Sequence, residues 1–279
     1  MIVGFIGFGE VSSTISNILS RNGIQTVTVV KGRSEKTNIR AIKSDVQIID
    51  SYDALVKGSD VVISANSPAN ALNVAKKVSK LMDDGIYIDL NNVSPDTTLK
   101  MSQLFEKPQE TLPKIEEKHS FFKKQEDVDM RNMFVDGAII GKVSNDSTTI
   151  LFSGQRSGDL AILNNYGLNI MIVSNKPGDV STLKTLRSLY TKGVSAVLME
   201  AYEASKEIGM VDQLFEILSL TEGETFEEKS KSRIRNSYKN SKRKVEEMDE
   251  ALEFLDKISP KGKKNFMTKA ARDKFNDVK

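Results

Sequence analysis

The chain has 279 residues, a length that fits two domains at ~150 residues per domain. It has no Cys, which excludes disulfide frameworks, Cys-ligated metal centres and Cys nucleophiles. It has a single His, His119. The 40 basic and 38 acidic residues nearly balance, so we expect no nucleic-acid surface over the whole protein. No apolar run approaches the ~18 residues of a membrane span, and we expect a cytoplasmic protein. With one His and no Cys, we expect Lys, Tyr or carboxylates to carry any protons in its chemistry.

Short runs rich in Val and Ile alternate with helical stretches in the first part of the chain, and their length is typical of strands covered on both faces. Between the first two runs, Val11–Asn22 carries an apolar stripe at helical spacing, and Gly23 ends this helix. Repeated strand–helix–strand units predict an α/β fold with a doubly wound, mostly parallel sheet of the Rossmann type. The expected strands are Ile2–Ile6, Thr26–Val30, Val46–Ile49, Val61–Ser64, Ile86–Leu90, Phe134–Ile139, Ile150–Ser153 and Ile170–Val173.

The pattern changes at about Asp179, where strand signals end and long helical periodicity begins. Apolar residues from Leu183 to Ala201 recur every three or four positions, which predicts one long buried helix, and Met248–Ile258 forms another amphipathic face. The turn-forming Pro177-Gly178 lies where the pattern changes. We therefore predict a Rossmann domain over residues 1–176 and an all-α C-terminal domain over residues 177–279.

Two segments have atypical charge. Residues 106–130 are rich in Lys and Glu and are expected to form an exposed insertion between two strands, with His119 as a solvated surface residue. Residues 229–244 hold eight Lys or Arg and no acid, and the acidic Glu246–Glu253 follows. Aromatic residues for base stacking are lacking there beyond Tyr238, so a solvated face or a subunit contact is favoured over nucleic-acid binding.

A glycine-rich turn follows the first expected strand and opens the first helix. Gly7 permits the tight turn, and Gly9 lets the backbone approach a pyrophosphate at the helix N-terminus, formed by Glu10 and Val11. Ser12 occupies the third position of the motif, where a small residue is needed and where its hydroxyl could act as a further donor. This placement in a βαβ unit predicts a dinucleotide site.

The residues after the second expected strand distinguish the two nicotinamide cofactors. An acidic residue there would bind the ribose 2′-hydroxyl of NAD, but this loop carries Arg33 and Ser34 and has no carboxylate. The guanidinium fork suits a phosphate, so NADP is favoured over NAD. After the fourth strand, Asn66, Ser67 and Pro68 are expected at the ligand-binding edge of the sheet, beside the nicotinamide ribose.

The turn Gly7–Val11 and the Gly32-Arg33-Ser34 loop resemble those of the β-hydroxyacid dehydrogenase, or 6-phosphogluconate dehydrogenase-like, superfamily. Later segments resemble a branch with a helical C-terminal domain of unknown function. These segments occur in the family's order over nearly the whole chain apart from residues 106–130. They are Asp89–Pro95, Val135–Gly141, Lys184–Ser188, Tyr190–Gly193 and Asn240–Met248.

The resemblance implies a general acid/base lysine on the helix between the domains. Lys184 lies in the stretch that best matches the family pattern, and Lys192 is the alternative. A lysine in a closed, partly dry cleft has its charged form disfavoured, so its pKa falls toward the working pH. The resemblance therefore implies hydride transfer at the cofactor and proton transfer at one of these lysines.

The substrate segments depart from the family pattern. Asn91-Asn92 replaces a Ser-Thr pair, Ile140-Gly141-Lys142 replaces Ser-Gly-Gly, and Arg187-Ser188 stands where an Asn is usual. The branch's His near the C-terminal basic pair is Asn240. We expect Asn91, Asn92, Gly141, Arg187 and Ser188 to bind a small acidic substrate, with a buried Arg187 able to pair with its acid group.

The sequence therefore predicts an NADP-dependent oxidoreductase that interconverts a small hydroxy acid and its carbonyl form, without a metal. Two alternatives stay open. One is an NADP(H)-binding sensor or scaffold without turnover, and the other is an imine reductase-like enzyme. The resemblance also implies a homodimer formed through the helical C-terminal domain. Arg243 and Lys244 could then reach an anionic substrate across the dimer.

Overall fold

The computed structural model describes residues 1–108, 130–141, 148–259 and 264–278. It divides into two compact units, Met1–Thr182 and Leu183–Lys279. The division falls inside a helix, α6 (Asp179–Glu207), a few residues after the predicted boundary at 176/177. His119 and most of the predicted insertion lie outside the described residues, as does Lys142.

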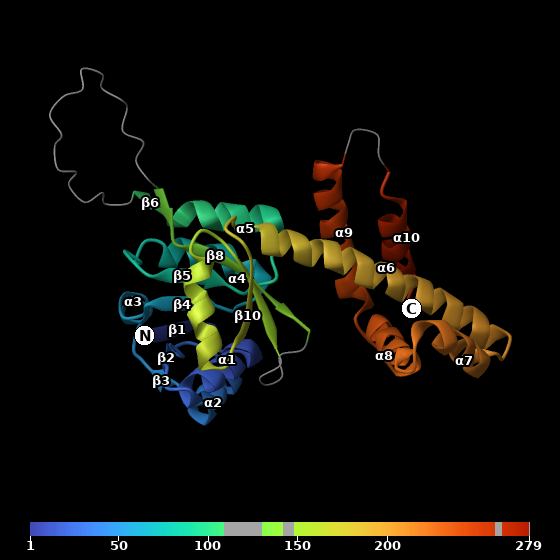
Figure 1. The fold of residues 1–279 in the computed structure, drawn as a ribbon, viewed down its shortest axis with the longest axis horizontal. Coiled ribbons are helices and arrows are strands. Elements are labelled where there is room, and N and C mark those ends of the chain that lie inside the picture. Colours follow the sequence, from blue (N-terminus) through green and yellow to red (C-terminus); the bar gives the residue numbers. More distant parts are fainter. Residues whose placement is uncertain (109–129, 142–147, 260–263, 279) are drawn as a thin grey trace, which may run out of the picture. The chain divides into compact units, whose positions relative to one another are not determined.

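The first unit is built on an eight-stranded sheet in the order β10-β9-β8-β5-β4-β1-β2-β3 (Figure 1). Neighbouring strands are parallel except for the antiparallel pair β8–β9, which confirms the predicted doubly wound, mostly parallel sheet. Each predicted strand is present with its ends shifted by at most one or two residues. The strands are β1 (Ile2–Ile6), β2 (Gln25–Thr28), β3 (Gln47–Ile48), β4 (Val61–Ser64), β5 (Ile86–Asp89), β8 (Phe134–Ile140), β9 (Thr149–Ser153) and β10 (Asn169–Ser174).

Two hydrophobic layers cover the sheet. On one face, α1 (Glu10–Arg21), α2 (Glu35–Lys43) and the 3₁₀ segment η3 (Ser157–Tyr166) pack over residues such as Phe5 and Ile88. On the other face lie α3 (Tyr52–Lys57), α4 (Pro68–Val78), α5 (Pro95–Ser102) and the 3₁₀ turn η1 (Gln103–Phe105). A two-stranded antiparallel ribbon, β6 (Glu106–Pro108) with β7 (Met130–Asn132), flanks the predicted insertion.

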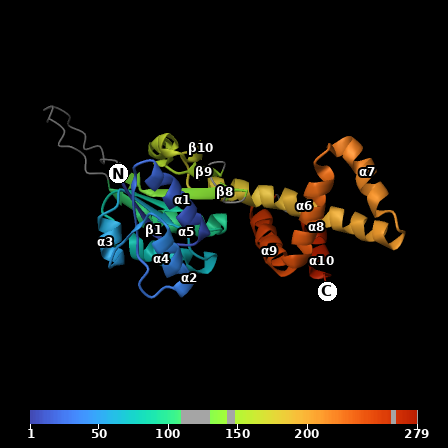
Figure 2. The ribbon, with the colours of Figure 1, turned by 90° about the horizontal axis from the view of Figure 1, so that it is seen from below.

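The second unit consists, in its described part, of helices and their connections (Figure 2). After α6 come α7 (Val211–Glu222), α8 (Phe226–Lys239), α9 (Ser241–Ile258) and α10 (Phe266–Asn276). Its core is formed by buried side chains from every one of these helices. They are Ala196, Leu198, Met199, Phe215, Ile234, Met248, Ala271 and Phe275.

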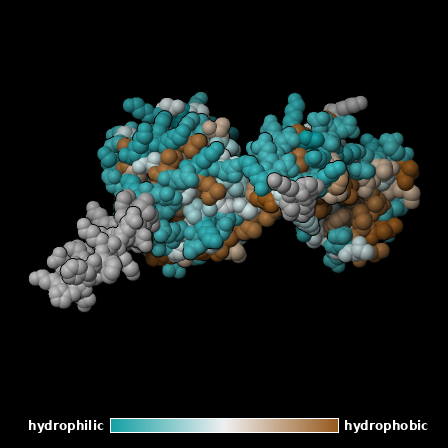
Figure 3. Space-filling model, turned by 90° about the horizontal axis from the view of Figure 1, so that it is seen from above, coloured by the Kyte–Doolittle hydropathy of each residue, from teal (hydrophilic) through white to brown (hydrophobic). Residues whose placement is uncertain are grey.

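The long helix α6 differs in one respect from the prediction. It was expected to be buried along its whole apolar stripe, but Leu186, Tyr190 and Val197 are exposed, with Tyr190 reaching 70%. Helical periodicity shows that apolar residues share a face, but it cannot show whether one chain supplies enough neighbours to cover that face. Hydrophobic residues accordingly gather on part of the surface of the helical unit in Figure 3.

Candidate functional site

The turn between β1 and α1 has the geometry that the glycine motif predicts. Gly7 has φ +86°, and a Cβ there would lie 2.5 Å from the Ala65 carbonyl oxygen and 2.6 Å from Asn66 Oδ1. Only glycine fits this position. A Cβ on Gly9, by contrast, would meet no atom within 4 Å. The open space beside Gly9 and the N-terminus of α1 together leave room for an anionic group against the backbone.

Ser12 stabilises this turn with a buried hydrogen bond. Its side chain is fully buried, and its hydroxyl donates to the Gly7 carbonyl at 2.6 Å. The hydroxyl predicted as a donor for the pyrophosphate is therefore bound within the protein in this structure. Val11 packs against the core, whereas Glu10 is exposed at the first position of α1.

The loop after β2 presents Arg33 and Ser34 at the same edge of the sheet. Arg33 is half-buried, donates to the Tyr52 hydroxyl, and holds its guanidinium carbon 5.9 Å from the centroid of the Tyr52 ring. The exposed Ser34 caps α2 by accepting from the Thr37 backbone N–H. The hydrogen bond and the ring contact with Tyr52 do not neutralise the positive charge of Arg33, which can therefore still bind an anion.

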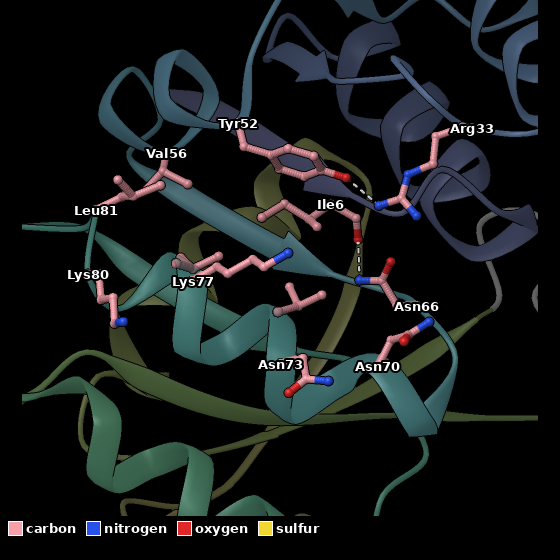
Figure 4. A pocket seen from close by; sticks show the side chains of 12 residues that line it. Ile6, Arg33, Tyr52, Val56, Asn66, Asn70, Asn73, Lys77, Lys80 and Leu81 are labelled. Carbon is pink, nitrogen blue, oxygen red and sulfur yellow. Dashed lines mark hydrogen bonds between the residues drawn. The ribbon is translucent and has the colours of Figure 1, made fainter.

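A cavity of about 570 Å³ lies next to Arg33, between α3 and α4 (Figure 4). One part of its wall is apolar, and amide and cationic side chains complete it. Its lining residues are Ile6, Arg33, Tyr52, Val56, Asn66, Asn70, Asn73, Val74, Lys77, Val78, Lys80 and Leu81. This combination of an apolar floor and a few polar groups is typical of small-molecule sites. The neighbouring Ser67 and Pro68 are exposed at the start of α4, where the Ser67 hydroxyl accepts from the Asn70 amide at 3.0 Å.

Asn91 is bound into a buried network under the ligand edge. Its Oδ1 accepts from the Asn66 backbone N–H at 2.5 Å, and its Nδ2 donates to Asp89 at 2.5 Å and to the Ser64 hydroxyl at 3.2 Å. Asn66 Nδ2 in turn donates to the Ile6 carbonyl and to Ser64. Of the two predicted substrate-binding asparagines, Asn91 therefore ties neighbouring strand ends together, while Asn92 is exposed.

The first turn of α6 is anchored to β8 and β9 by buried side chains. The Asp136 carboxylate accepts from the Ser181 backbone N–H and from its hydroxyl, both at 2.8 Å. Ser153 on β9 accepts from the Val180 backbone N–H at 3.1 Å. These contacts satisfy N–H groups that a helix start leaves without intrahelical partners, and they hold the first turn of α6 to the sheet.

Of the remaining predicted site residues, those on α6 lie after this anchor and one lies next to β8. Lys184 and Ser188 are half-buried on α6, in the helical unit, and Arg187 is exposed rather than buried. Gly141 follows β8 in the first unit, is exposed and has φ +91°. Lys184 follows Ser181 by three residues along α6.

Lys192 is buried within the helical unit. Its ammonium lies 2.5 Å from a Glu247 carboxylate oxygen and donates to the Ser188 hydroxyl, and Arg243 also pairs with Glu247, at 3.2 Å. Burial, together with the positive charge of Lys192, lowers the pKa of the neighbouring Lys244 to about 8. Lys192 thus serves as part of an ion-paired cluster that joins α6 to α9.

The sequence analysis did not predict that Tyr52 and Arg40 lie at the site. It also did not predict that Asp136 anchors the first turn of α6. Arg40 on α2 donates to the Phe8 carbonyl in the glycine turn. Asp136 could have been noticed as a buried carboxylate inside an apolar predicted strand. A partner on another helix cannot be read in this way, so Tyr52 and Arg40 carried no signal.

The part of the chain that the structure describes lacks two further kinds of feature. No helix in that part of the chain is long and apolar enough to span a membrane. The same residues hold no group of three or more His, Asp or Glu side chains placed to bind a metal ion.

Comparisons with known proteins follow the same lines. The profile of the family described as "NADP oxidoreductase coenzyme F420-dependent" matches residues 2–93. An uncharacterized 28.5 kDa protein of Methanothermus fervidus, described as lying in the 7S RNA 5′ region, is 41% identical over all of this chain and 99% of its own. The conserved protein MTH1747, of unknown function and structurally similar to 3-hydroxyacid dehydrogenases, is 35% identical with a TM-score of 0.78, covering 100% of this chain and 96% of its own. The chain belongs to the β-hydroxyacid dehydrogenase superfamily.

Mycobacterium tuberculosis 3-hydroxyisobutyrate dehydrogenase has the same fold as the present chain. The TM-score is 0.73 at 14% identity, and the match covers 99% of this chain and 92% of the M. tuberculosis chain. Membership of the β-hydroxyacid dehydrogenase superfamily makes the protein an oxidoreductase with an NADP-type Rossmann domain.

Proposed function

We propose that this β-hydroxyacid dehydrogenase homologue transfers a hydride between NADP(H) and a small hydroxy acid or its keto form, or a related carbonyl. The observation that carries the proposal is the pairing of an open glycine turn with an arginine-bearing, carboxylate-free loop beside a cavity. An acidic residue at the end of β2 would repel the 2′-phosphate of NADP, and Arg33 would attract it. NAD is the less favoured cofactor for that reason.

The residues on either side of the cavity fit NADP(H). The backbone of Gly9, Glu10 and Val11 at the start of α1 would hold the pyrophosphate, and Arg33 with Ser34 would hold the 2′-phosphate. The cavity between α3 and α4 is large enough for an adenosine moiety. When bound, the nicotinamide ring supplies the hydride chemistry.

Asn66, Ser67 and Pro68 shape the edge of the same site. Asn66 is held by the Ile6 carbonyl and by Ser64, so its backbone has a fixed position at the end of β4. Ser67 and Pro68 form the exposed start of α4. We assign these three residues to the nicotinamide ribose side of the cofactor, as the position after the fourth strand favours.

Lys184 is our choice for the proton carrier. In the oxidative direction a neutral amine takes the hydroxyl proton, and in reduction the ammonium donates it to the oxygen. Lys192 is the weaker choice, because its ammonium is paired with Glu247 inside the helical unit. For the acidic substrate, Arg187 offers the cationic contact, and Asn92, Gly141 and Ser188 are further contacts; Asn91 acts through the network that it closes.

A screen of hydroxy acids, sugar acids, keto acids and imines with NADP⁺ and NADPH tests this function. We expect turnover of an acid-bearing alcohol or carbonyl, and Lys184→Ala is expected to lose about 10²–10⁴-fold in kcat while keeping its affinity for NADPH. Turnover that survives in Lys184→Ala contradicts the lysine assignment. Turnover of imines alone would favour the imine reductase alternative, and NADPH binding without turnover of any class would favour a sensor or scaffold.

We also propose that the protein is a homodimer formed through the helical unit and located in the cytoplasm. Along α6, the exposed Tyr190 and Val197 line an apolar groove of about 650 Å³ together with Gly193 and Ala201. One face thus offers both protruding side chains and a hollow, as a two-fold self-association needs. Sedimentation is expected to give a dimer, and Tyr190→Glu with Val197→Glu a monomer; a monomeric wild type at micromolar concentration refutes this.

A further inference from the structure

Arg40 lies against the glycine turn from a neighbouring helix. It is half-buried on α2, and its Nη1 donates to the Phe8 carbonyl oxygen at 3.4 Å. Phe8 stands between Gly7 and Gly9, and its buried ring packs into the core beneath the turn. A guanidinium has five N–H donors, and this contact uses one of them.

The position of Arg40 follows from how α2 packs. Ala41 is the buried residue of α2, and it joins the core cluster that contains Ile15 and Leu19 of α1. This contact sets α2 beside α1 on the same face of the sheet. Residue 40 is thereby placed next to the start of α1, where its long side chain reaches the turn.

Arg33 lies in the loop after β2, and Arg40 lies against the turn after β1, the parallel neighbour of β2. Each of the two guanidiniums is held by a neutral oxygen. Arg33 donates to a phenol, and Arg40 donates to a backbone carbonyl. Within the part of the chain that the structure describes, neither guanidinium has a carboxylate in ion-pair distance. Two guanidiniums without a carboxylate partner, beside the adjoining ends of β1 and β2, favour an anionic ligand.

We propose that Arg40 is a second specificity-determining residue for NADP, which binds the 2′-phosphate together with Arg33. The inference rests on the proposed cofactor function. The end of β2 is the position from which Rossmann domains read the ribose 2′ position, and Arg33 follows it. Arg40 contacts the turn that follows β1, and because β1 and β2 are parallel neighbours, their carboxyl ends lie side by side at one edge of the sheet. The pyrophosphate has its own partners in the backbone at the start of α1, so it does not require Arg40.

Binding of NADPH, NADH, 2′,5′-ADP and 5′-ADP to the full chain tests the proposal by calorimetry. The variants are Arg40→Gln and Arg40→Lys, with Arg33→Gln as the benchmark and the exposed Arg21→Gln, at the end of α1, as the matched control. Arg40→Gln is expected to weaken NADPH and 2′,5′-ADP by roughly ten- to a hundredfold. Its affinity for NADH and 5′-ADP is expected to change less than about twofold, and Arg40→Lys is expected to be intermediate.

Three results would overturn the proposal. An unchanged NADPH affinity in Arg40→Gln removes Arg40 from the site. Equal losses for NADPH and NADH assign it to the pyrophosphate or to support of the turn. A wild-type chain that binds none of the four ligands refutes the proposed cofactor function itself, which distinguishes that failure from a failure of the Arg40 assignment alone. Melting temperatures without ligand show whether Arg40→Gln is folded.

Discussion

The two glycines of the β1–α1 turn are predicted to respond in opposite ways to the same substitution. Gly9→Ala adds a methyl group that meets no protein atom within 4 Å, at an extended backbone position with φ −84° and ψ −164°. Gly7→Ala adds the same group at φ +86°, against a backbone carbonyl and an amide oxygen. The first change tests ligand approach, and the second tests the fold.

The magnitudes follow from these surroundings. For Gly7→Ala, a left-handed backbone costs about 1–2 kcal/mol, and overpacking against atoms 2.5 Å and 2.6 Å away adds about 1–3 kcal/mol. The sum of about 2–5 kcal/mol corresponds to a melting temperature lower by roughly 4–20 °C. Gly9→Ala is expected to change the unfolding free energy by less than ~1 kcal/mol, with stabilisation as the favoured sign.

Thermal melting without ligand and NADPH titration of both variants provide the assay. Gly9→Ala is expected to melt like the wild type but to bind NADPH at least ~10-fold more weakly, since its methyl group occupies the space for the pyrophosphate. Wild-type NADPH affinity in Gly9→Ala would refute the close approach of the backbone to the cofactor. Equal destabilisation by the two variants would refute the structural distinction between the glycines.

Three further predictions concern the anchor and the charged cluster of the helical unit. Asp136→Ala is expected to lower the unfolding free energy by about 2–3 kcal/mol in urea unfolding, because it leaves the Ser181 N–H buried without its acceptor, and Asp136→Asn is expected to cost less. Glu247→Gln is expected to cost about 2–4 kcal/mol, as it removes the carboxylate of the buried Lys192, and the double variant with Lys192→Met is expected to recover much of the loss. Because burial lowers the pKa of Lys244 to about 8 from 10.5, its charged form destabilises the fold below pH 8, and this cost disappears as the pH rises toward 10.5. Lys244→Met is therefore expected to raise the melting temperature at pH 7 and to lose this advantage at pH 10; an equal effect at both values contradicts the assignment.

The sheet and its glycine turn could be predicted from the sequence because they depend on local patterns. Runs such as Val61–Ser64 are apolar throughout, which identifies strands covered on both faces, and the turn at Gly7 and Gly9 follows directly from a strand. The long helix α6 was predicted from its periodicity. The basic segment was read as one feature, but the structure divides it between α8 and α9 at Asn240.

Side-chain networks between distant segments could not be predicted in this way. Asn91 contacts Ser64 across 27 positions, and Arg33 contacts Tyr52 across 19, and neither pairing leaves a periodic trace. The family pattern marked Asn91 as a substrate contact, and the hydrogen bonds that it makes to Asn66 and Asp89 could not be predicted from that pattern. The exposed stripe on α6 could not be predicted either, because the spacing of apolar residues on a helix does not show whether other side chains cover them.

The central claim, that this Rossmann unit selects NADP(H) through Arg33, is tested most directly by titrating the unmodified full chain with NADPH and with NADH. We predict that NADPH binds at least ~10-fold more tightly, as a charge-assisted contact to the 2′-phosphate requires. Equal affinity for the two cofactors, or tighter binding of NADH, would contradict the claim.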